Sequence, residues 1–391
     1  FAMGNQTVAS GAFSTASGLL TQSQGIFSTA MGFKTIAEGK ASLAFGVKSR
    51  AIGNQSIALG GVPPNVEGYT IAKGVASVSI GKETQALGPF SIAIGDSSIA
   101  DSTFAMALGK STEANGFASL SMGYYTSAGG DFSTSMGNKT TASGKYSVAM
   151  GHSTSAGGEA SLAMGRESRA NGNFSMAIGD NSEAIGDISF ALGANAYAGN
   201  TGTFVAGANS TVSGIGSIAM GSNLNVTGNG SFGISLGNSF STIEVGSSGV
   251  MAIMNGALGV GTASPQSKLE VVGGDIRVSS GSIIDDGTTL SDYVFEEDYE
   301  LETIEEHAAF MWKNKHLPAV SSAREIEEKN GYDISERREQ ILEELEKAHI
   351  YIEQLNNQIK ELKSENEELK EKVNEIDTIK QQLEEIQNNM K

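Results

Sequence analysis

The amino-acid sequence predicts a fibrous protein that is mainly a β solenoid and that ends in an α-helical coiled coil. Three observations carry this prediction. Glycine returns at every seventh residue for more than half of the chain, small and large side chains alternate between these glycines, and apolar residues recur three and four apart near the C-terminus. A repeat this short cannot bury a core alone, so successive units must stack on one another, as they do in a solenoid.

The glycine period is nearly unbroken. Counting in steps of seven from Gly4 to Gly228 gives 33 positions, and 30 of them are glycine. A glycine every seven residues costs a helix roughly 1 kcal/mol each time, which excludes a helical interpretation of this region. The three positions that depart from the period are Glu67, Ser102 and Asn200.

The repeating unit is a pair of heptads, because two kinds of heptad alternate. One kind reads x-x-Ser-x-Ala-x-Gly, as in Phe90–Gly95 and Tyr146–Gly151, and the other is more polar, as in Ser168–Gly172. The stretch Gly61–Gly68 breaks this alternation. We interpret it as one extra half-unit, with a surface loop at its two prolines.

Alternation with a period of two indicates strands. Ser and Ala then point into a very narrow roll, and the Val, Ile, Leu, Met or Phe residues between them point out. Glycine is expected at the corners, where a tight turn needs a positive φ. A long apolar stripe in water predicts association of chains along its length. The residues expected in the core of that association are Ile92, Ile94, Val148, Met150, Met176 and Ile178.

These repeats resemble the YadA-like head repeats of trimeric autotransporter adhesins over about residues 1–235. The resemblance implies a left-handed parallel β-roll that makes one turn per pair of heptads. It also implies that three chains pack their apolar faces together, which would place the six residues above in a trimer core. The alternative is a disordered tract rich in Gly, Ser and Ala, but such tracts do not keep a fixed alternation of large and small residues.

Composition narrows the function classes. The chain has no cysteine, so neither a disulfide framework nor a thiolate metal site is expected. No run of 18 apolar residues occurs, so no membrane-spanning helix is expected. Residues 292–391 hold 27 of the 44 acidic and 13 of the 26 basic side chains, and they therefore carry most of the net charge of −18. Neither the nearly neutral repeat region nor this acidic end suits a nucleic-acid backbone.

A β connector is expected at residues 238–291. Gly256–Pro265 reads as a turn, and Lys268–Val278 reads as two short strands around a Gly-Gly turn. The segment resembles one found in tail-fibre-like proteins and bacterial surface-fibre proteins. That resemblance implies that strands of three chains interleave here.

A small α/β adaptor is expected at residues 292–335. A helix is predicted from Thr303 to about Lys313, with Thr303 and Glu306 as a capping box and Pro318 beyond its end. A second helix starts at Ser322 and stops at Asn330-Gly331. The stretch resembles the C-terminal module of surface-fibre proteins of Bacteroidetes-type bacteria, which implies a role in attachment or in trimer nucleation.

Residues 336–391 are predicted to form a parallel coiled coil. Ile at a, Leu at d and one Asn at a favour two strands in isolation, but the longer contact of the roll leads us to expect three. Asn366 is interpreted as a register pin, with an enclosed ion or water as a second interpretation. Position a holds Leu345, Ile352, Ile359, Asn366 and Val373, and position d holds Ile341, Ala348, Leu355, Leu362, Leu369 and Ile376.

Other residues give no convincing site. The four histidines lie far apart, without metal-ligand spacing, and the glycines at 256–261 do not lead into a helix, so neither a metal nor a phosphate site is predicted. Ser291-Asp292 lacks the lysine of a self-cleaving fibre chaperone. Trp312 is interpreted as a core residue rather than a partner anchor, and no regular Thr array supports ice binding. No catalytic, metal-binding or cofactor-binding residue is predicted, no cofactor is expected, and no ligand-binding residue can be named.

The predicted order is a β-roll head at 1–237 with about 16 turns, the connector, the adaptor and the coil. We expect no enzyme. We expect a homotrimeric extracellular fibre on a bacterial cell surface or on a virion or other particle, acting as an adhesin through many weak contacts with a receptor, a matrix protein or a glycan. The alternatives are a receptor-binding tail fibre of a phage or contractile injection system, and a purely structural filament or spacer. Because Phe1 lies inside a repeat, we expect the chain to be a processed or truncated piece.

Overall fold

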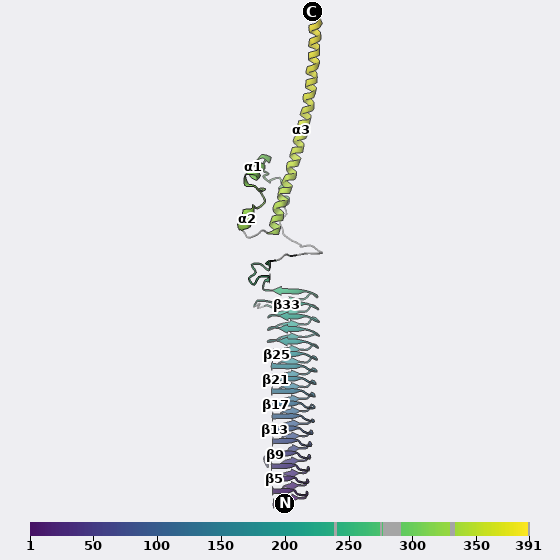
Figure 1. Cartoon of the computed structure of the whole chain (residues 1–391), viewed down its shortest axis with the longest axis vertical. Coiled ribbons are helices and arrows are strands. Elements are labelled where there is room, and N and C mark those ends of the chain that lie inside the picture. Colours follow the sequence, from purple (N-terminus) through teal and green to yellow (C-terminus); the bar gives the residue numbers. More distant parts are fainter. Residues whose placement is uncertain (238–240, 274–275, 277–290, 329–332, 390–391) are drawn as a thin grey trace. The chain divides into compact units, whose positions relative to one another are not determined.

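The computed structural model describes residues 1–237, 241–273, 276, 291–328 and 333–389. The chain divides into two compact units, Phe1–Asp275 and Ile276–Lys391, and each is described by itself. The first unit is a parallel β solenoid whose rungs stack one above the next (Figure 1). The second consists of helices.

Long strands form one sheet of the solenoid, which has 18 strands within the described residues. These strands are β1 (Ala2–Asn5), β3 (Thr15–Leu19), β5 (Thr29–Phe33), β7 (Leu43–Val47), β9 (Ile57–Gly61), β11 (Val78–Lys82), β13 (Ile92–Asp96), β15 (Met106–Lys110), β17 (Leu120–Tyr124), β19 (Thr134–Asn138), β21 (Val148–His152), β23 (Leu162–Arg166), β25 (Met176–Asp180), β27 (Phe190–Leu192), β29 (Phe204–Ala206), β31 (Ile218–Met220), β33 (Phe232–Ser235) and β35 (Met251–Met254).

Short strands form a second parallel sheet on the other side of the roll. They are β2 (Val8–Ala9), β4 (Gln22–Ser23), β6 (Ile36–Ala37), β8 (Ser49–Ala51), β10 (Thr70–Ala72), β12 (Gln85–Ala86), β14 (Ile99–Ala100), β16 (Glu113–Ala114), β18 (Ser127–Ala128), β20 (Thr141–Ala142), β22 (Ser155–Ala156), β24 (Arg169–Ala170), β26 (Glu183–Ala184), β28 (Tyr197–Ala198), β30 (Thr211–Val212), β32 (Leu224–Val226) and β34 (Ile243–Val245).

In both sheets a residue of one regular rung pairs with the residue two heptads further along the chain. In β13 and β15, Ala93 pairs with Ala107 and Gly95 with Gly109, so identical side chains stack directly on each other. The backbone amides of each rung donate to carbonyls of the next, as from Ile92 N to Ala105 O at 2.9 Å. A one-residue slip would exchange the inner and outer faces, so the alternating pattern specifies this register strongly.

The interior of the roll is lined by small side chains, as the alternation predicts. Alanines of both sheets, such as Ala93 and Ala100, are fully buried, and so are the serines and threonines between them. Several of these hydroxyls donate to backbone carbonyls within the turn, as from Ser147 Oγ to Gly144 O at 2.6 Å. The roll therefore has a thin core, and most of its large apolar side chains lie outside it.

Only half of the heptad glycines have the positive φ that we expected at the corners. Gly123, the fourth residue of β17, has φ +127°, whereas Gly130, one heptad later, has no such φ. Both are nevertheless required, because an added Cβ would lie 2.0 Å from a carbonyl oxygen of the next rung, that of Gly137 or of Gly144. Close stacking of rungs is therefore the common reason for the glycine period, and the positive-φ explanation was incomplete.

Two irregularities interrupt the period. Between β9 and β11 the register offset grows by one heptad, with Ala58 paired to Ser79, and the extra half-unit contains exposed Pro63 and Pro64, as expected. Near the other end, Phe232 pairs with Met251, an offset longer than the two heptads of a regular rung. The solenoid pairing thus continues to Met254, past the point at Gly237 where the sequence period fades.

Beyond the solenoid, β36 (Leu258–Val260) pairs in parallel with β37 (Leu269–Val271). The first strand expected after Lys268 is present as β37, whereas β36 lies in the stretch that was expected to be a turn. The further strand expected before Val278 and the helix stop expected at Asn330-Gly331 lie outside the described residues.

The second unit contains η1 (Ser291–Phe295), α1 (Ile304–Asn314), α2 (Ala323–Glu328) and α3 (Ile334–Asn389). The capping box predicted at Thr303 and Glu306 is present, and α1 ends at Lys315 in a left-handed conformation. Ser322 caps α2 by accepting from Glu325 N at 3.2 Å. Local sequence signals were therefore sufficient to place both short helices.

Candidate interaction surfaces

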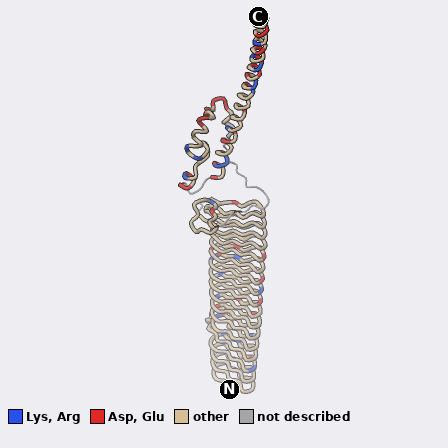
Figure 2. The backbone as a smooth tube through the Cα atoms, turned by 45° about the horizontal axis from the view of Figure 1, so that its top comes forward, with Lys and Arg blue, Asp and Glu red and all other residues tan. Residues whose placement is uncertain are grey.

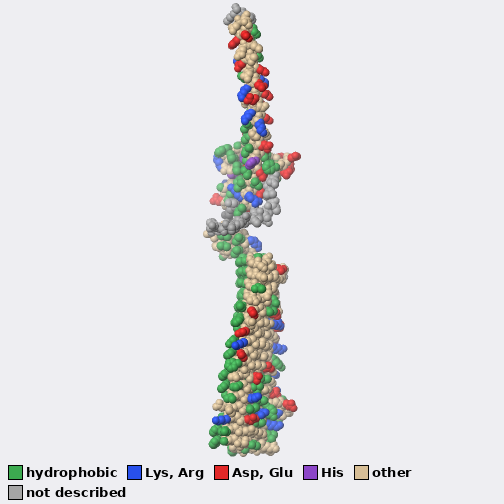
Figure 3. Space-filling view, turned by 90° about the vertical axis from the view of Figure 1, so that its right-hand side faces the viewer, with side chains coloured by type: hydrophobic (Ala, Val, Ile, Leu, Met, Phe, Trp, Pro, Cys, Tyr) green, Lys and Arg blue, Asp and Glu red, His purple; other side chains and the backbone are tan. Residues whose placement is uncertain are grey.

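The outer face of the long-strand sheet is the largest apolar surface of the roll. All six residues predicted for a multi-chain core lie on it: Ile92 and Ile94 on β13, Val148 and Met150 on β21, and Met176 and Ile178 on β25. Each is partly exposed in the single chain, with Ile94 39% exposed. In Figure 3 hydrophobic side chains run along one edge of the roll. The arrangement is inverted relative to a globular domain, with small side chains inside and large ones outside.

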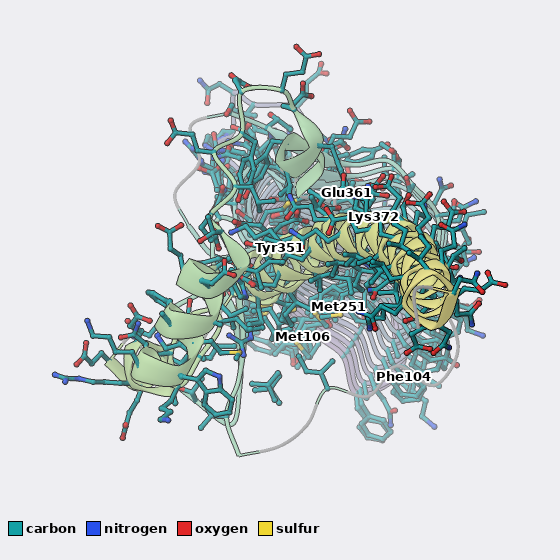
Figure 4. The ribbon with its side chains drawn as sticks, turned by 90° about the horizontal axis from the view of Figure 1, so that it is seen from above. Phe104, Met106, Met251, Tyr351, Glu361 and Lys372 are labelled. Carbon is teal, nitrogen blue, oxygen red and sulfur yellow. The ribbon has the colours of Figure 1, made fainter. Side chains whose placement is uncertain are left out.

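A column of aromatic residues lies at the corner that precedes the long strands. Phe13 stacks on Phe27 with ring centroids 5.0 Å apart, and Phe90 stacks on Phe104 at 5.2 Å. Figure 4, which looks down onto the rungs, labels Phe104 beside Met106 of β15. All four phenylalanines have φ of +58°. This conformation costs a residue with a side chain roughly 1–2 kcal/mol. The roll thus carries exposed aromatic rings at residues whose backbone conformation is strained. In later rungs the equivalent position of the repeat is held by glycine, as at Gly216 and Gly230.

The opposite face, made by the short strands, is mainly polar, although Ile36, Ile71 and Ile99 also face outward on it. Its outward residues include Glu113, Ser127, Thr141 and Ser155. Charged pairs connect successive rungs of the roll, as between Arg169 and Glu183 at 2.6 Å. Such exposed pairs contribute about 0–1 kcal/mol each, so they mark a solvated surface rather than a buried one. Charged side chains are sparse along the roll and dense along α3 (Figure 2).

Helix α3 presents an unpartnered apolar seam. The nine residues predicted for a coiled-coil core all lie on it, and Leu362 is 56% exposed in the single chain. Glu361 and Lys372 project from the same helix (Figure 4). Whether the seam forms a coiled coil stays a prediction. The nine residues are Leu345, Ile352, Leu355, Ile359, Leu362, Asn366, Leu369, Val373 and Ile376.

Asn366 provides a test of the seam. Its side chain donates to Leu362 O at 2.9 Å, a local bond that leaves the amide oxygen for an interchain contact. A polar residue at an a position lowers the stability of a coiled coil while it specifies the register. We therefore expect Asn366→Ile to raise the melting temperature of the helical signal and to broaden the distribution of oligomers in sedimentation. Asn374→Ile, at a b position, is the control, and an equal effect of both substitutions would contradict the seam assignment.

A buried polar cluster joins α1 to the beginning of α3. His307 lies between two carboxylates, with Nδ1 3.0 Å from Glu302 Oε1 and Nε2 3.5 Å from Glu344 Oε2. Lys347 Nζ lies 2.8 Å from Glu343 Oε1, and Lys347 is 5% exposed. Two tyrosines that are distant in sequence complete the cluster: Tyr293 donates to Glu343 at 2.8 Å, and Tyr351 donates to Glu302 O at 2.9 Å.

This cluster shifts the pKa values of its members. Burial alone would raise the pKa of Glu302 and of Glu343, but hydrogen bonds from His307 and Lys347, respectively, bring both below the usual value of 4.5. Burial alone would lower the pKa of Lys347, but its bond to Glu343 raises it above the usual range. Burial raises the pKa of Tyr293 and Tyr351 to about 12, with help from the nearby carboxylates.

These shifts predict a helical unit that loses stability at both ends of the pH scale. The lowered carboxyl pKa values add stability above about pH 4.5, and this is lost as the pH falls through the folded values. The raised tyrosine pKa values add stability below pH 10 that is lost between pH 10 and about 12. We expect thermal melting of the helical signal to show both losses. The double variant Tyr293→Phe/Tyr351→Phe should flatten the alkaline limb, and an unchanged alkaline limb would contradict the assignment.

The remaining residues singled out from the sequence do not converge. His152 lies on β21, His316 Nδ1 is 2.9 Å from Leu317 O, and His349 Nδ1 is 2.8 Å from Leu345 O. Within the part of the chain that the structure describes, no group of three His, Asp or Glu side chains could hold a metal ion, and no helix is long and apolar enough to cross a membrane. The core interpretation of Trp312 is wrong for the single chain, because this residue is 68% exposed.

Comparison with protein families agrees with this geometry. The model of the YadA head domain repeat matches repeatedly along the solenoid, and its matches together cover more than half of the 391 residues. None of the curated proteins compared with the chain matches it significantly. The matched ranges are 1–21, 23–49, 37–61, 72–98, 87–112, 114–140, 128–154, 142–168, 156–182, 170–196 and 198–223.

Proposed function

The chain belongs to the family of YadA head-domain repeats, and from this premise we propose that it is one subunit of a trimeric surface adhesin. The family is homotrimeric, and its repeats imply a surface-exposed, extracellular protein. The observation that carries the proposal is the inversion of the roll, with Ala93 buried and Ile92 and Ile94 facing out.

Association of three chains would bury the outer apolar face. A fully buried Ile or Met side chain is stabilised by roughly 1.5–3 kcal/mol relative to an exposed one, and the face repeats over successive rungs. The thin core of alanine and serine supplies little of this kind of stabilisation. We therefore assign the six outward residues, from Ile92 to Ile178, to the trimer core, and the seam of α3 to a parallel coiled coil that supports the same stoichiometry.

The polar face of the short strands would stay in solvent in such a trimer. Many of its rungs present polar or charged side chains, and they would do so on three chains, so a ligand that is itself repetitive could make many contacts together. Weak single contacts then give firm attachment, which is the physical basis for proposing adhesion to a cell, a matrix or a glycan surface. The proposal names no individual ligand residue.

Two measurements on the full chain test the proposal. Sedimentation equilibrium should give three times the 40.5 kDa of one chain. Beads coated with the chain should attach to cells or matrix proteins in a saturable manner, and free chain should compete. A stable, soluble single chain would contradict the trimer. A trimer whose beads attach to no cell, matrix protein or arrayed glycan would contradict adhesion and leave the role of a structural spacer.

A further inference from the structure

Helix α1 is apolar on much of its surface but poorly covered by its own chain. It contains Ile304, Phe310, Met311 and Trp312, and none of its 11 residues is buried. Its contacts with α3 run mainly through His307, which lies 3.5 Å from Glu344 and has its ring centroid 5.4 Å from that of Tyr351. A short helix in water is marginal without tertiary packing, so the exposed flank of α1 requires a partner surface.

The heptad positions of α3 show which surface that is. The three buried residues of α3 are Glu344, Lys347 and Tyr351. They occupy positions g, c and g when Leu345 and Ile352 are at a. The chain's own segments therefore cover one side of α3 and leave the a and d seam open, with Leu345 53% exposed. This geometry is compatible with association of α3 through its seam.

In a parallel coiled coil the g positions of one helix face the e positions of the next. Since α1 lies against the g positions of its own α3, it would lie beside the e side of the neighbouring copy. That side carries Leu342 and His349 at e. Of the carboxylates at the neighbouring b positions, Glu339 is paired with Arg338 and Glu346 is partly buried within its own chain, whereas Glu353 is exposed.

The exposed flank of α1 is complementary to this surface. Trp312 lines a shallow hollow together with Met311, Lys315, His316 and Leu317. The Lys315 ammonium lies 5.4 Å from the Trp312 ring centroid. An apolar ring with Lys315 beside it can cover the apolar part of an e side, while the lysine faces the exposed Glu353.

We propose that α1 of each chain docks on the e and b side of α3 in a neighbouring copy, with Trp312 as the anchor of this contact. The proposal rests on the trimer proposed above. In this arrangement α1 holds two adjacent α3 helices together from outside, while the apolar seams of the helices pack against each other inside. Both contacts require a neighbouring copy of the chain.

The test uses the full chain, because Trp312 is its one tryptophan and its emission therefore comes from α1 alone. A reference that cannot trimerise through α3 is Leu355→Asp/Leu362→Asp, which places two charges in the seam. The trimer should show a blue-shifted Trp312 emission and several-fold slower quenching by acrylamide than this reference variant. A trimer whose emission and quenching equal those of the reference would overturn the docking while leaving the trimer intact, and absence of a trimer in sedimentation would overturn both.

A pair of variants separates docking from general loss of an aromatic residue. Trp312→Ala should lower the melting temperature of the helical signal and make it more dependent on protein concentration. Phe295→Ala is the matched control, because Phe295 of η1 is also strongly exposed, at 61%, but lies on another segment. Equal melting temperatures for the two variants would overturn the proposal.

Discussion

Gly123→Ala is expected to open the roll at its rung and to destabilise it by more than about 4 kcal/mol, a size reached only by a few mechanisms. Two of them act here at once. The backbone φ of +127° is one that residues with a side chain rarely adopt, and the new Cβ would lie 2.0 Å from the carbonyl oxygen of Gly137. Hydrogen exchange should show lost protection in β17 and β19, and cleavage by a protease should begin there.

Three other glycines of the roll separate the causes. Gly130→Ala meets a carbonyl oxygen at 2.0 Å without a positive φ, so it isolates the clash. Gly216→Ala has φ +64° in open space, which predicts a cost of about 1 kcal/mol. Gly61→Ala has neither problem and should stay within about 0.5 kcal/mol of the parent. If Gly61→Ala and Gly130→Ala were equally tolerated, close stacking of rungs could not be the reason for the period.

A lysine column on the outer apolar face is expected to abolish the proposed association of three rolls. Met136, Met150 and Met164 stack on successive rungs of β19, β21 and β23. Replacing all three in each of three chains by lysine removes apolar burial on the order of 20 kcal/mol, at roughly 1.5–3 kcal/mol for each of the nine side chains. It also forces like charges into a low-dielectric interface, where an unpaired ammonium is costly. Sedimentation of the full chain should show the loss of the trimer or its aggregation.

The control for this variant carries the same added charge on the polar face. Ser127, Thr141 and Ser155 lie at equivalent outward positions of β18, β20 and β22. Their replacement by lysine should leave the sedimentation of the full chain unchanged, because the side chains stay in water. The interface would have to lie on a different face of the roll in either of two cases: if the lysines on the short strands dissociated the trimer, or if the trimer survived replacement of the three methionines.

Much of the solenoid could be predicted because its contacts are local in the repeat. Each regular rung touches the rung two heptads away, so a residue such as Ala93 meets the equivalent Ala107. Alternation along one strand therefore decides burial for the whole sheet. The caps of α1 and α2 were predictable for the same reason, since Thr303 and Ser322 each bond to a residue three positions later. The structure predicted from local sequence patterns agrees with the observed one wherever the contacting residues are close in sequence.

The sequence by itself determined the period, the inward alanines and outward methionines, the extra half-unit near Pro63 and the two capped helices. Only the tertiary structure decided that Gly130 is required by the approach of the next rung rather than by its φ, that pairing continues to Met254, and that Trp312 is exposed. It also brought Tyr293 to Glu343 and His307 to Glu344 of α3, and placed Tyr351 against His307 and the backbone carbonyl of Glu302. The physical reason is distance along the chain: a contact such as that between Tyr293 and Glu343, 50 residues apart, leaves no periodic trace in the sequence.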